Sequence, residues 1–136
     1  MSQLRPSMDW MLKDLADSVP GTRNVVVLTG DGLRMAQYGT DDDTADRLAA
    51  ACAGLQSLSY AIAGEFAHGD RTLRLVVIES SGGFFYLMAA GAGAYLAVLA
   101  EETVDPGLMG QRMRDLVARI GAHLTSPPRA EGSVVL

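Results

Sequence analysis

The longest regular pattern of hydrophobic and polar positions runs through residues 42–67 and predicts one long helix. Its charged residues are confined towards the two ends of the segment. Apolar side chains recur at steps of three and four residues, which places them in one stripe along the helix. This stripe consists of Leu48, Ala51, Cys52, Leu55, Leu58, Ile62 and Phe66. We expect it to pack on the protein's own core.

The opposite face of the predicted helix carries small residues where a surface helix normally carries charges. These residues alternate steps of four and three, the spacing of a seam between two helices. They are Ala50, Gly54, Ser57, Ala61 and Gly64. Two interpretations are open for this segment alone: a seam against a second molecule, or a helix enclosed within a single domain.

Two further amphipathic patterns predict helices at the two ends of the chain. The first covers residues 8–19, begins at Ser7 and stops at Pro20-Gly21. Its stripe is Met8, Met11, Leu12, Leu15 and Val19. The last helix is capped by Asp105, has Pro106 in its first turn and runs to about His123. Its stripe is Met109, Met113, Leu116, Val117, Ile120 and Leu124.

Between these helices, five short apolar segments bounded by glycine-rich turns predict β-strands. The predicted strands cover residues 24–29, 33–38, 71–79, 84–90 and 94–100. The order is therefore α-β-β-α-β-β-β-α. It indicates an α/β (α+β) fold in which three helices flank one five-stranded antiparallel sheet. We expect a single domain at residues 7–124, a flexible N-terminus at 1–6 and a disordered tail at 125–136.

The third predicted strand is apolar and has a free edge if the last three strands pair in chain order. An uncovered apolar edge promotes association unless something pairs with it. Because the long helix directly precedes this strand, one dimer would bury both features. We therefore predict a dimer interface of Ala50, Gly54, Ser57, Ala61, Gly64, Leu73, Leu75 and Val77.

The amino-acid composition is typical of a protein that forms homo-oligomers. Of 136 residues, 49% are hydrophobic and only 20% are charged, which is apolar for a small monomer. The formal net charge of −5 argues against nucleic acid as a partner. The single cysteine excludes an internal disulfide, and neither a secretory leader nor a membrane-spanning segment is evident. We expect a cytoplasmic protein whose only membrane association is through partners.

Motifs for catalysis or for metal and cofactor binding are missing from the sequence. It contains no GxxxxGK[ST] or GxSxG pattern, and His68 and His123 stand in no ligand pattern. The acidic residues 41–43 lack the glycine and glutamate of a calcium loop, so we interpret them as helix-capping acids. Cys52 is interpreted as a core residue. Trp10 lies off the first stripe; we expect it to pack on a neighbouring element rather than to anchor a partner.

Several pieces in a fixed order resemble the roadblock domain, and more narrowly the roadblock proteins of actinobacterial conservon operons. No single piece is specific, and the ordered set spans residues 9–124. The pieces are Val19-Pro20-Gly21, Thr29 with Asp31-Gly32-Leu33, Gly54-Leu55-Gln56-Ser57-Leu58, Gly82-Gly83-Phe84 and Ala97-Val98-Leu99.

The resemblance implies a profilin-like fold and a homodimer in which the long helix meets its symmetry mate and the third strand continues the sheet. It further implies a non-enzymatic module that binds and regulates a small Ras-like GTPase, with a sensor-kinase-like protein as a second partner. Arg34, Arg71, Arg74 and Arg112 are open candidates for an arginine supplied to the GTPase. The alternative is a small-molecule-sensing or scaffold domain without a GTPase partner.

Overall fold

The computed structural model describes residues 4–125 and contains the eight predicted elements in the predicted order. Of the N-terminus expected to be flexible at 1–6, residues 1–3 lie outside the described residues and 4–6 belong to the first helix. Of the tail expected at 125–136, only Thr125 is described, and it ends the last helix. The elements are α1 Leu4–Ser18, β1 Thr22–Thr29, β2 Arg34–Tyr38, α2 Asp42–Ala63, β3 Leu75–Ser80, β4 Gly83–Gly91, β5 Ala94–Ala100 and α3 Pro106–Thr125.

The five strands form one antiparallel sheet in the order β2-β1-β5-β4-β3. The predicted pairing of the last three strands is confirmed, and β3 lies at an edge. Residues Val25 to Leu28 of β1 are fully buried, as expected for a strand with both faces covered.

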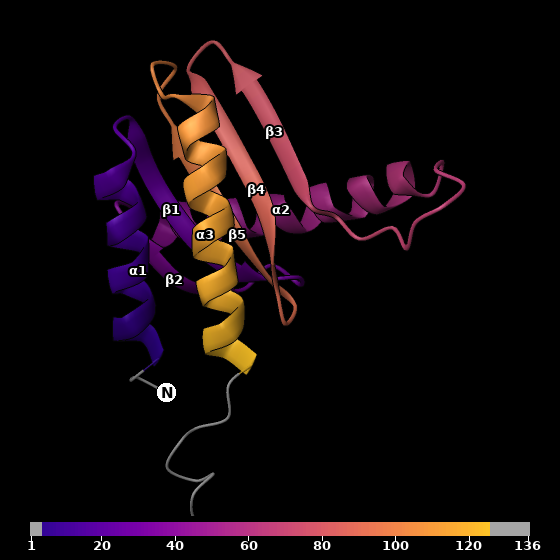
Figure 1. Ribbon diagram of the computed structural model, residues 1–136, viewed down its shortest axis with the longest axis horizontal. Coiled ribbons are helices and arrows are strands. Elements are labelled where there is room, and N and C mark those ends of the chain that lie inside the picture. The colour runs from indigo at the N-terminus through magenta and orange to yellow at the C-terminus, as the bar shows by residue number, and fades with distance from the viewer. Residues whose placement is uncertain (1–3, 126–136) are drawn as a thin grey trace, which may run out of the picture.

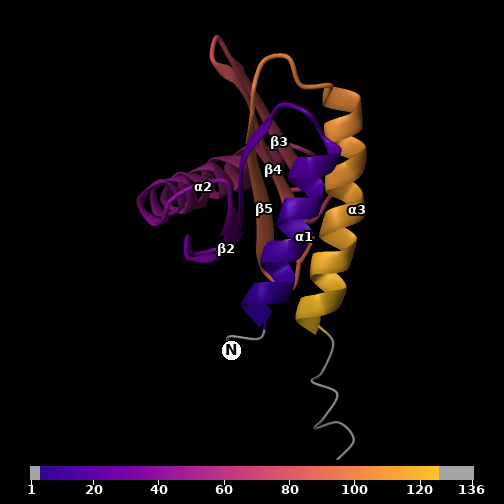
Figure 2. The same cartoon turned by 90° about the vertical axis from the view of Figure 1, so that its left-hand side faces the viewer.

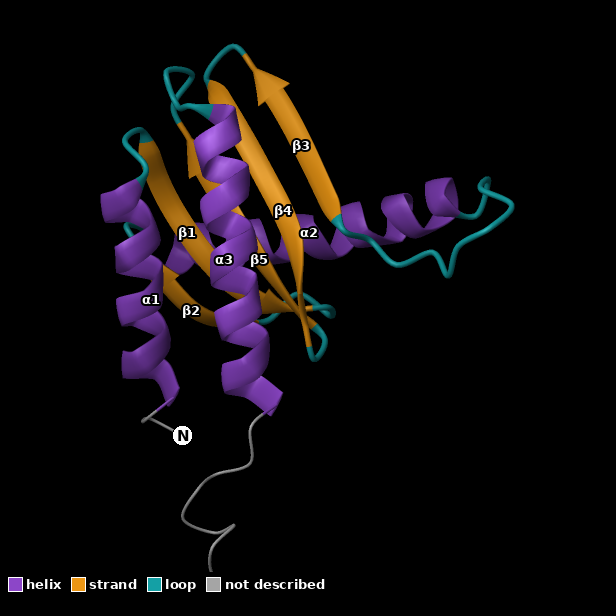
Figure 3. Ribbon diagram, in the orientation of Figure 1, coloured by secondary structure: helices purple, strands orange, loops and turns teal. Residues whose placement is uncertain are grey.

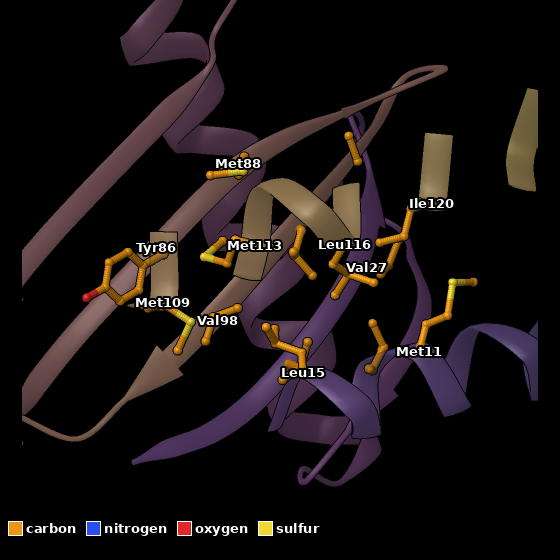
Figure 4. Close-up of a cluster of buried hydrophobic side chains, with 14 of the residues drawn as sticks. Met11, Leu15, Val27, Tyr86, Met88, Val98, Met109, Met113, Leu116 and Ile120 are labelled. Atoms are coloured by element: carbon orange, nitrogen blue, oxygen red, sulfur yellow. The ribbon is translucent and has the colours of Figure 1, made fainter. Parts of the chain in front are cut away.

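Helices cover the two faces of the sheet unequally. The two views in Figures 1 and 2 place α1 and α3 together on one face and α2 alone on the other. The larger core lies under the α1–α3 pair, where the stripes of both helices meet the sheet as predicted (Figure 4). Asp105 caps α3 as expected, because its Oδ1 accepts the Leu108 N–H at 3.1 Å.

The smaller core lies under α2. Ala45, Ala49 and Cys52 are fully buried against the sheet residues Val26, Leu28, Leu87 and Ala97. Their small side chains let the helix backbone approach the sheet closely. The start of α2 is fixed by its cap, since Asp41 Oδ1 accepts the Thr44 N–H at 2.7 Å. This hydrogen bond lowers the pKa of Asp41.

A polar bridge also joins the start of α2 to the edge strand β2. Arg34 Nε donates to Asp46 Oδ1 at 2.6 Å, and its Nη2 lies 3.4 Å from Asp42 Oδ2. Gln37 also donates to Asp42, at 2.9 Å. The first half of α2 is thus attached to the sheet by both apolar and polar contacts.

The predicted apolar stripe of α2 is only partly a core stripe, which corrects the sequence prediction. Cys52 is buried, and Leu48 and Leu55 are half-buried. Ala51 is exposed, and Leu58, Ile62 and Phe66 are 64%, 64% and 69% exposed. The helix meets the sheet through an adjacent, smaller-residue face, and its second half has no sheet beneath it.

Three predicted boundaries and one predicted side-chain position were also wrong. The long helix ends at Ala63 rather than at 67, and β3 begins at Leu75 rather than at 71, so residues 64–74 form a connecting segment. Helix α1 begins at Leu4, four residues before the prediction. Trp10 is 62% exposed instead of packed on a neighbouring element.

Candidate functional site

The second half of α2 projects beyond the β3 edge of the sheet. Its 22 residues correspond to a length of about 33 Å. Five strands spaced 4.7–4.9 Å apart span only about 19 Å from the first axis to the last. Because the helix runs across the strands, it overhangs the sheet, as Figure 1 shows. A helical half without packing partners is marginal in water.

The overhang and β3 collect most of the exposed large hydrophobic side chains. Of the nine among the described residues, seven lie on the second half of α2, the segment after it or β3. They are Leu58, Tyr60, Ile62, Phe66, Leu75, Val77 and Ile78. They gather around the β3 edge from both faces of the sheet: Ile78 lies on the face that α2 covers, and Leu75 and Val77 lie on the face that α1 and α3 cover. An exposed apolar cluster of this size on a small protein marks an interaction site. We call it, together with the small residues of α2, the α2–β3 surface.

The small residues predicted for the seam are largely on the surface. Ala50, Gly54, Ser57 and Ala61 are exposed, as a partner seam requires. Apart from the adjacent backbone of α2, a Cβ placed on Gly54 would meet none of the described atoms within 4 Å, so packing within residues 4–125 does not demand a glycine there. The enclosed-helix interpretation is therefore wrong for these four positions.

Gly64 differs from the other small residues because its own chain occupies the space beside it. A Cβ on Gly64 would lie 2.8 Å from the guanidinium carbon of Arg71. Arg71 itself adopts a left-handed backbone conformation, with φ of 64°. Its guanidinium carbon also lies 4.8 Å from the centre of the Tyr60 ring. The end of α2 and the start of the connecting segment are thus in direct contact.

The β3 edge supplies the second part of the surface. Leu75 and Val77 are 39% and 48% exposed, and Ile78, on the opposite face of the sheet, is 43% exposed. One edge of β3 pairs with β4, and none of the strands in the described part of the chain lies along the other. Leu73 lies before the strand and is half-buried against the smaller core, so it contributes less exposed surface than predicted.

A groove of about 480 Å³ runs between the overhanging helix and the segment that returns to β3. Ile62 and Phe66 form its apolar helical wall, and residues 68–76 form the other. Figure 3 shows how this segment leaves the end of α2 and turns back to the sheet. The groove is open, so it does not enclose a ligand as a core cavity would.

The remaining chemistry of the described residues is sparse. No group of three or more His, Cys, Asp and Glu residues is placed to hold a metal ion within residues 4–125. Burial raises the pKa of the Cys52 thiol to about 11, which keeps it protonated. Over the same range, no helix has the length and hydropathy to span a bilayer.

Sequence reasoning missed the largest side chains of the surface. Leu58, Ile62 and Phe66 were assigned to the core, and Tyr60 and Ile78 were not singled out. One signal was available in the sequence: a helix of this length is longer than a five-stranded sheet is wide. The distal part of its apolar stripe therefore had no sheet to cover it.

Comparisons with known proteins agree with this architecture. The model of the Roadblock/LC7 domain family matches residues 8–100. A Roadblock/LC7 domain of Streptomyces avermitilis is 36% identical, with a TM-score of 0.80 over 87% of this chain and 98% of that one. No curated protein sequence matches significantly.

Two more distant structures share the fold. MglB in a tetrameric arrangement is 16% identical, with a TM-score of 0.80 over 88% of this chain and 89% of that one. Profilin II of Acanthamoeba castellanii is 16% identical, with a TM-score of 0.56 over 88% of this chain and 97% of that one. The profilin-like, roadblock-type fold expected from the sequence is confirmed.

Proposed function

Because this chain belongs to the Roadblock/LC7 domain family, we propose that it is a homodimeric binding module that regulates a small Ras-like GTPase. The dimer proposal rests chiefly on one observation. The α2–β3 surface combines exposed apolar residues, exposed small residues and an unpaired strand edge. Separate functions for three such features around one edge of the sheet are a less economical explanation than one interface.

The proposed dimer has two-fold symmetry, so that the same surface of each copy contacts the other. The two α2 helices pack through Ala50, Gly54, Ser57 and Ala61, where small side chains allow close approach. The two β3 strands pair along their free edges and extend the sheet across the two-fold axis. Each overhanging half-helix then lies over the partner's sheet, where Leu58 and Ile62 become covered.

Self-association also receives support from one structural relative. MglB, which shares this fold, has been described in a tetrameric arrangement. We carry over from it only the tendency to associate, because the sequence identity of 16% supports the fold alone. The dimer proposal therefore depends chiefly on this chain's own exposed surface.

The GTPase partner is proposed from the roadblock resemblance. We propose regulation by holding or repositioning the GTPase's own residues rather than by donating an arginine. Three of the four candidate arginines already have partners: Arg34 contacts Asp46 at 2.6 Å, Arg71 lies on the Tyr60 ring, and Arg112 lies 4.0 Å from Asp115. Hydrogen bonds from Thr72 chiefly lower the pKa of Asp70, and the charge of Arg74 adds a smaller lowering. A cytoplasmic location and a sensor-kinase-like partner are part of the same proposal.

The experiment for the regulatory role uses the small Ras-like GTPases encoded in the same genome, purified one by one. Binding and GTP turnover are measured with wild-type protein and with a monomeric variant such as Gly54→Leu. We expect one GTPase to bind and to change its hydrolysis or nucleotide-exchange rate. If none of them binds or changes its rate, the regulatory role is wrong, while the dimer stands on its own test.

A further inference from the structure

We propose that one contact within the chain holds the α2–β3 surface in the conformation that a second copy binds. The contact joins Arg71 to Tyr60 and Gly64, and we call it the lock. Arg71 is a positioning residue in this proposal, acting through the segment that carries it. The inference rests on the proposed dimer, and it names the groups that prepare one copy for the other. The end of α2 at Ala63 and the start of β3 at Leu75, both placed elsewhere by the sequence prediction, lie on either side of this contact.

The backbone of Arg71 is the first observation. A left-handed conformation is unfavourable for a residue with a Cβ, and it persists only where the surroundings impose it. The chain places a long cationic side chain at this position, although Gly69, two residues earlier, shows that glycine is used nearby at positive φ. The conformation turns the chain back so that the Arg71 side chain reaches the end of α2.

The contacts of the guanidinium are the second observation. It lies over the Tyr60 ring, 4.8 Å from its centre, which is the geometry of a cation–π contact. It also fills the space that a side chain at Gly64 would need, since a Cβ there would lie 2.8 Å from Cζ and from Nη2. Gly64 itself has φ of −65°, so its backbone does not require glycine. A side chain at this position would need the space that the Arg71 guanidinium occupies.

Electrostatics at the helix end provide a third observation. The last turn of α2 contains no basic residue. The C-terminal end of a helix carries a partial negative charge, which a nearby cation stabilises. Arg71 brings such a cation to this end from the following segment. This charge stabilises the end of α2 at Ala63, and β3 begins at Leu75, four residues after Arg71.

The connecting segment has few other attachments. Asp70 Oδ1 accepts the Thr72 N–H at 3.0 Å, which is a local turn, and Arg74 O accepts the Ala89 N–H at 3.1 Å at the start of β3. Leu73 packs against the smaller core. Between these points and α2, the Arg71–Tyr60 contact closes the segment onto the helix. It thereby positions Ile62 and Phe66 on one wall of the groove against the other wall.

A symmetric dimer contains two such locks, one in each chain. The factor by which an open lock lowers the binding-competent fraction of one chain therefore enters the dimer dissociation constant squared. If opening the lock lowers the binding-competent fraction of each chain about threefold, the dimer dissociation constant rises roughly tenfold. Arg71→Gly is the sharpest perturbation, because it removes the whole side chain, including the guanidinium, while glycine tolerates the positive φ. Arg71→Lys keeps the charge but loses the planar group, and we expect a smaller rise.

The test is a cycle of Gly64→Ala and Arg71→Gly in the full chain, with the dimer dissociation constant measured by analytical ultracentrifugation. Gly64→Ala alone should displace the guanidinium and weaken the dimer about as much as Arg71→Gly. In the Arg71→Gly background, Gly64→Ala should have no further effect. Arg74→Ala, a matched loss of positive charge from the same groove wall, should stay within roughly threefold of wild type.

A spectroscopic readout accompanies the cycle. In a Val77→Lys variant designed to be monomeric, the Arg71 side-chain proton signals should be shifted upfield by the Tyr60 ring and should return to ordinary values in Tyr60→Leu. A dimer dissociation constant of Arg71→Gly equal to that of wild type would contradict the proposed lock. Additive effects of the two substitutions in the cycle would contradict it as well. A monomeric wild-type protein would contradict the proposed dimer, and with it the positioning role of Arg71.

Discussion

Substitution of Gly54 by leucine should raise the stability of the monomer and lower the affinity of the dimer. Gly54 lies in the middle of α2, where no described atom outside the surrounding turns of the helix backbone comes within 4 Å of an added Cβ. Gly54→Leu therefore replaces a poor helix former without a clash in the monomer. We expect the monomer's free energy of unfolding to rise by about 0.8 kcal/mol.

In the dimer, the same leucine enters the closest contact between the two α2 helices. Overpacking costs about 1–3 kcal/mol per inserted side chain, and the two-fold symmetry inserts two of them, which gives about 2–6 kcal/mol. The dimer dissociation constant should therefore rise by a factor of roughly 30 to 10⁴. Gly54→Ala should give most of the monomer stabilisation with a much smaller loss of affinity.

The assay combines sedimentation for the dimer and urea unfolding for the monomer, the latter at protein concentrations below the dissociation constant. Ala118→Leu is the control for added apolar surface, because Ala118 is exposed on α3, away from the α2–β3 surface. A Gly54→Leu variant that dimerises as tightly as wild type would refute the seam. A loss of monomer stability would refute the open environment inferred for Gly54.

Three further predictions concern the edge strand, the helix cap and the buried thiol. Val77→Lys places a charge on the free β3 edge and should weaken the dimer while changing monomer stability by less than about 0.5 kcal/mol; equal losses of both would contradict an exposed interface position. The pKa of Asp41 is lowered from 3.8 by the Thr44 N–H, so its contribution is present above pH 3.8 and is lost as the pH falls through the lower folded value. Urea unfolding between pH 2 and 5 should therefore show a smaller acid-induced loss of stability in Asp41→Asn than in wild type, and identical pH profiles would exclude the cap's role. Cys52, with a pKa of about 11, should react slowly with a thiol reagent at pH 8 and faster as the pH approaches 11; rapid labelling at pH 8 in native buffer would contradict its burial.

The fold was largely predictable because its local signals agree with one another. Strand Ala94–Ala100 was predicted to the residue, and the Asp105 cap marked the start of α3 correctly. Periodicity alone identified the α1 and α3 stripes, since both helices pack along their length on the same face of the sheet. Short turns between the last three strands fixed their pairing order.

The errors came from contacts that periodicity does not contain. Leu58 and Ile62 have the spacing of core residues, but α2 overhangs the sheet there, and both side chains remain 64% exposed. The spacing of Gly64 matches the seam, yet a residue seven positions later occupies the space beside it. The exposure of the two apolar residues and the contact at Gly64 both depend on the path of the chain after the helix. The residue pattern within the helix contains no information on that path.

The oligomeric state of the wild-type protein is the measurement that tests the central claim most directly. Light scattering coupled to size-exclusion chromatography at micromolar concentration should give about twice the chain mass of 14.4 kDa. The same experiment on Gly54→Leu should shift the mass towards that of one chain. A wild-type mass of one chain throughout this concentration range would contradict the homodimer.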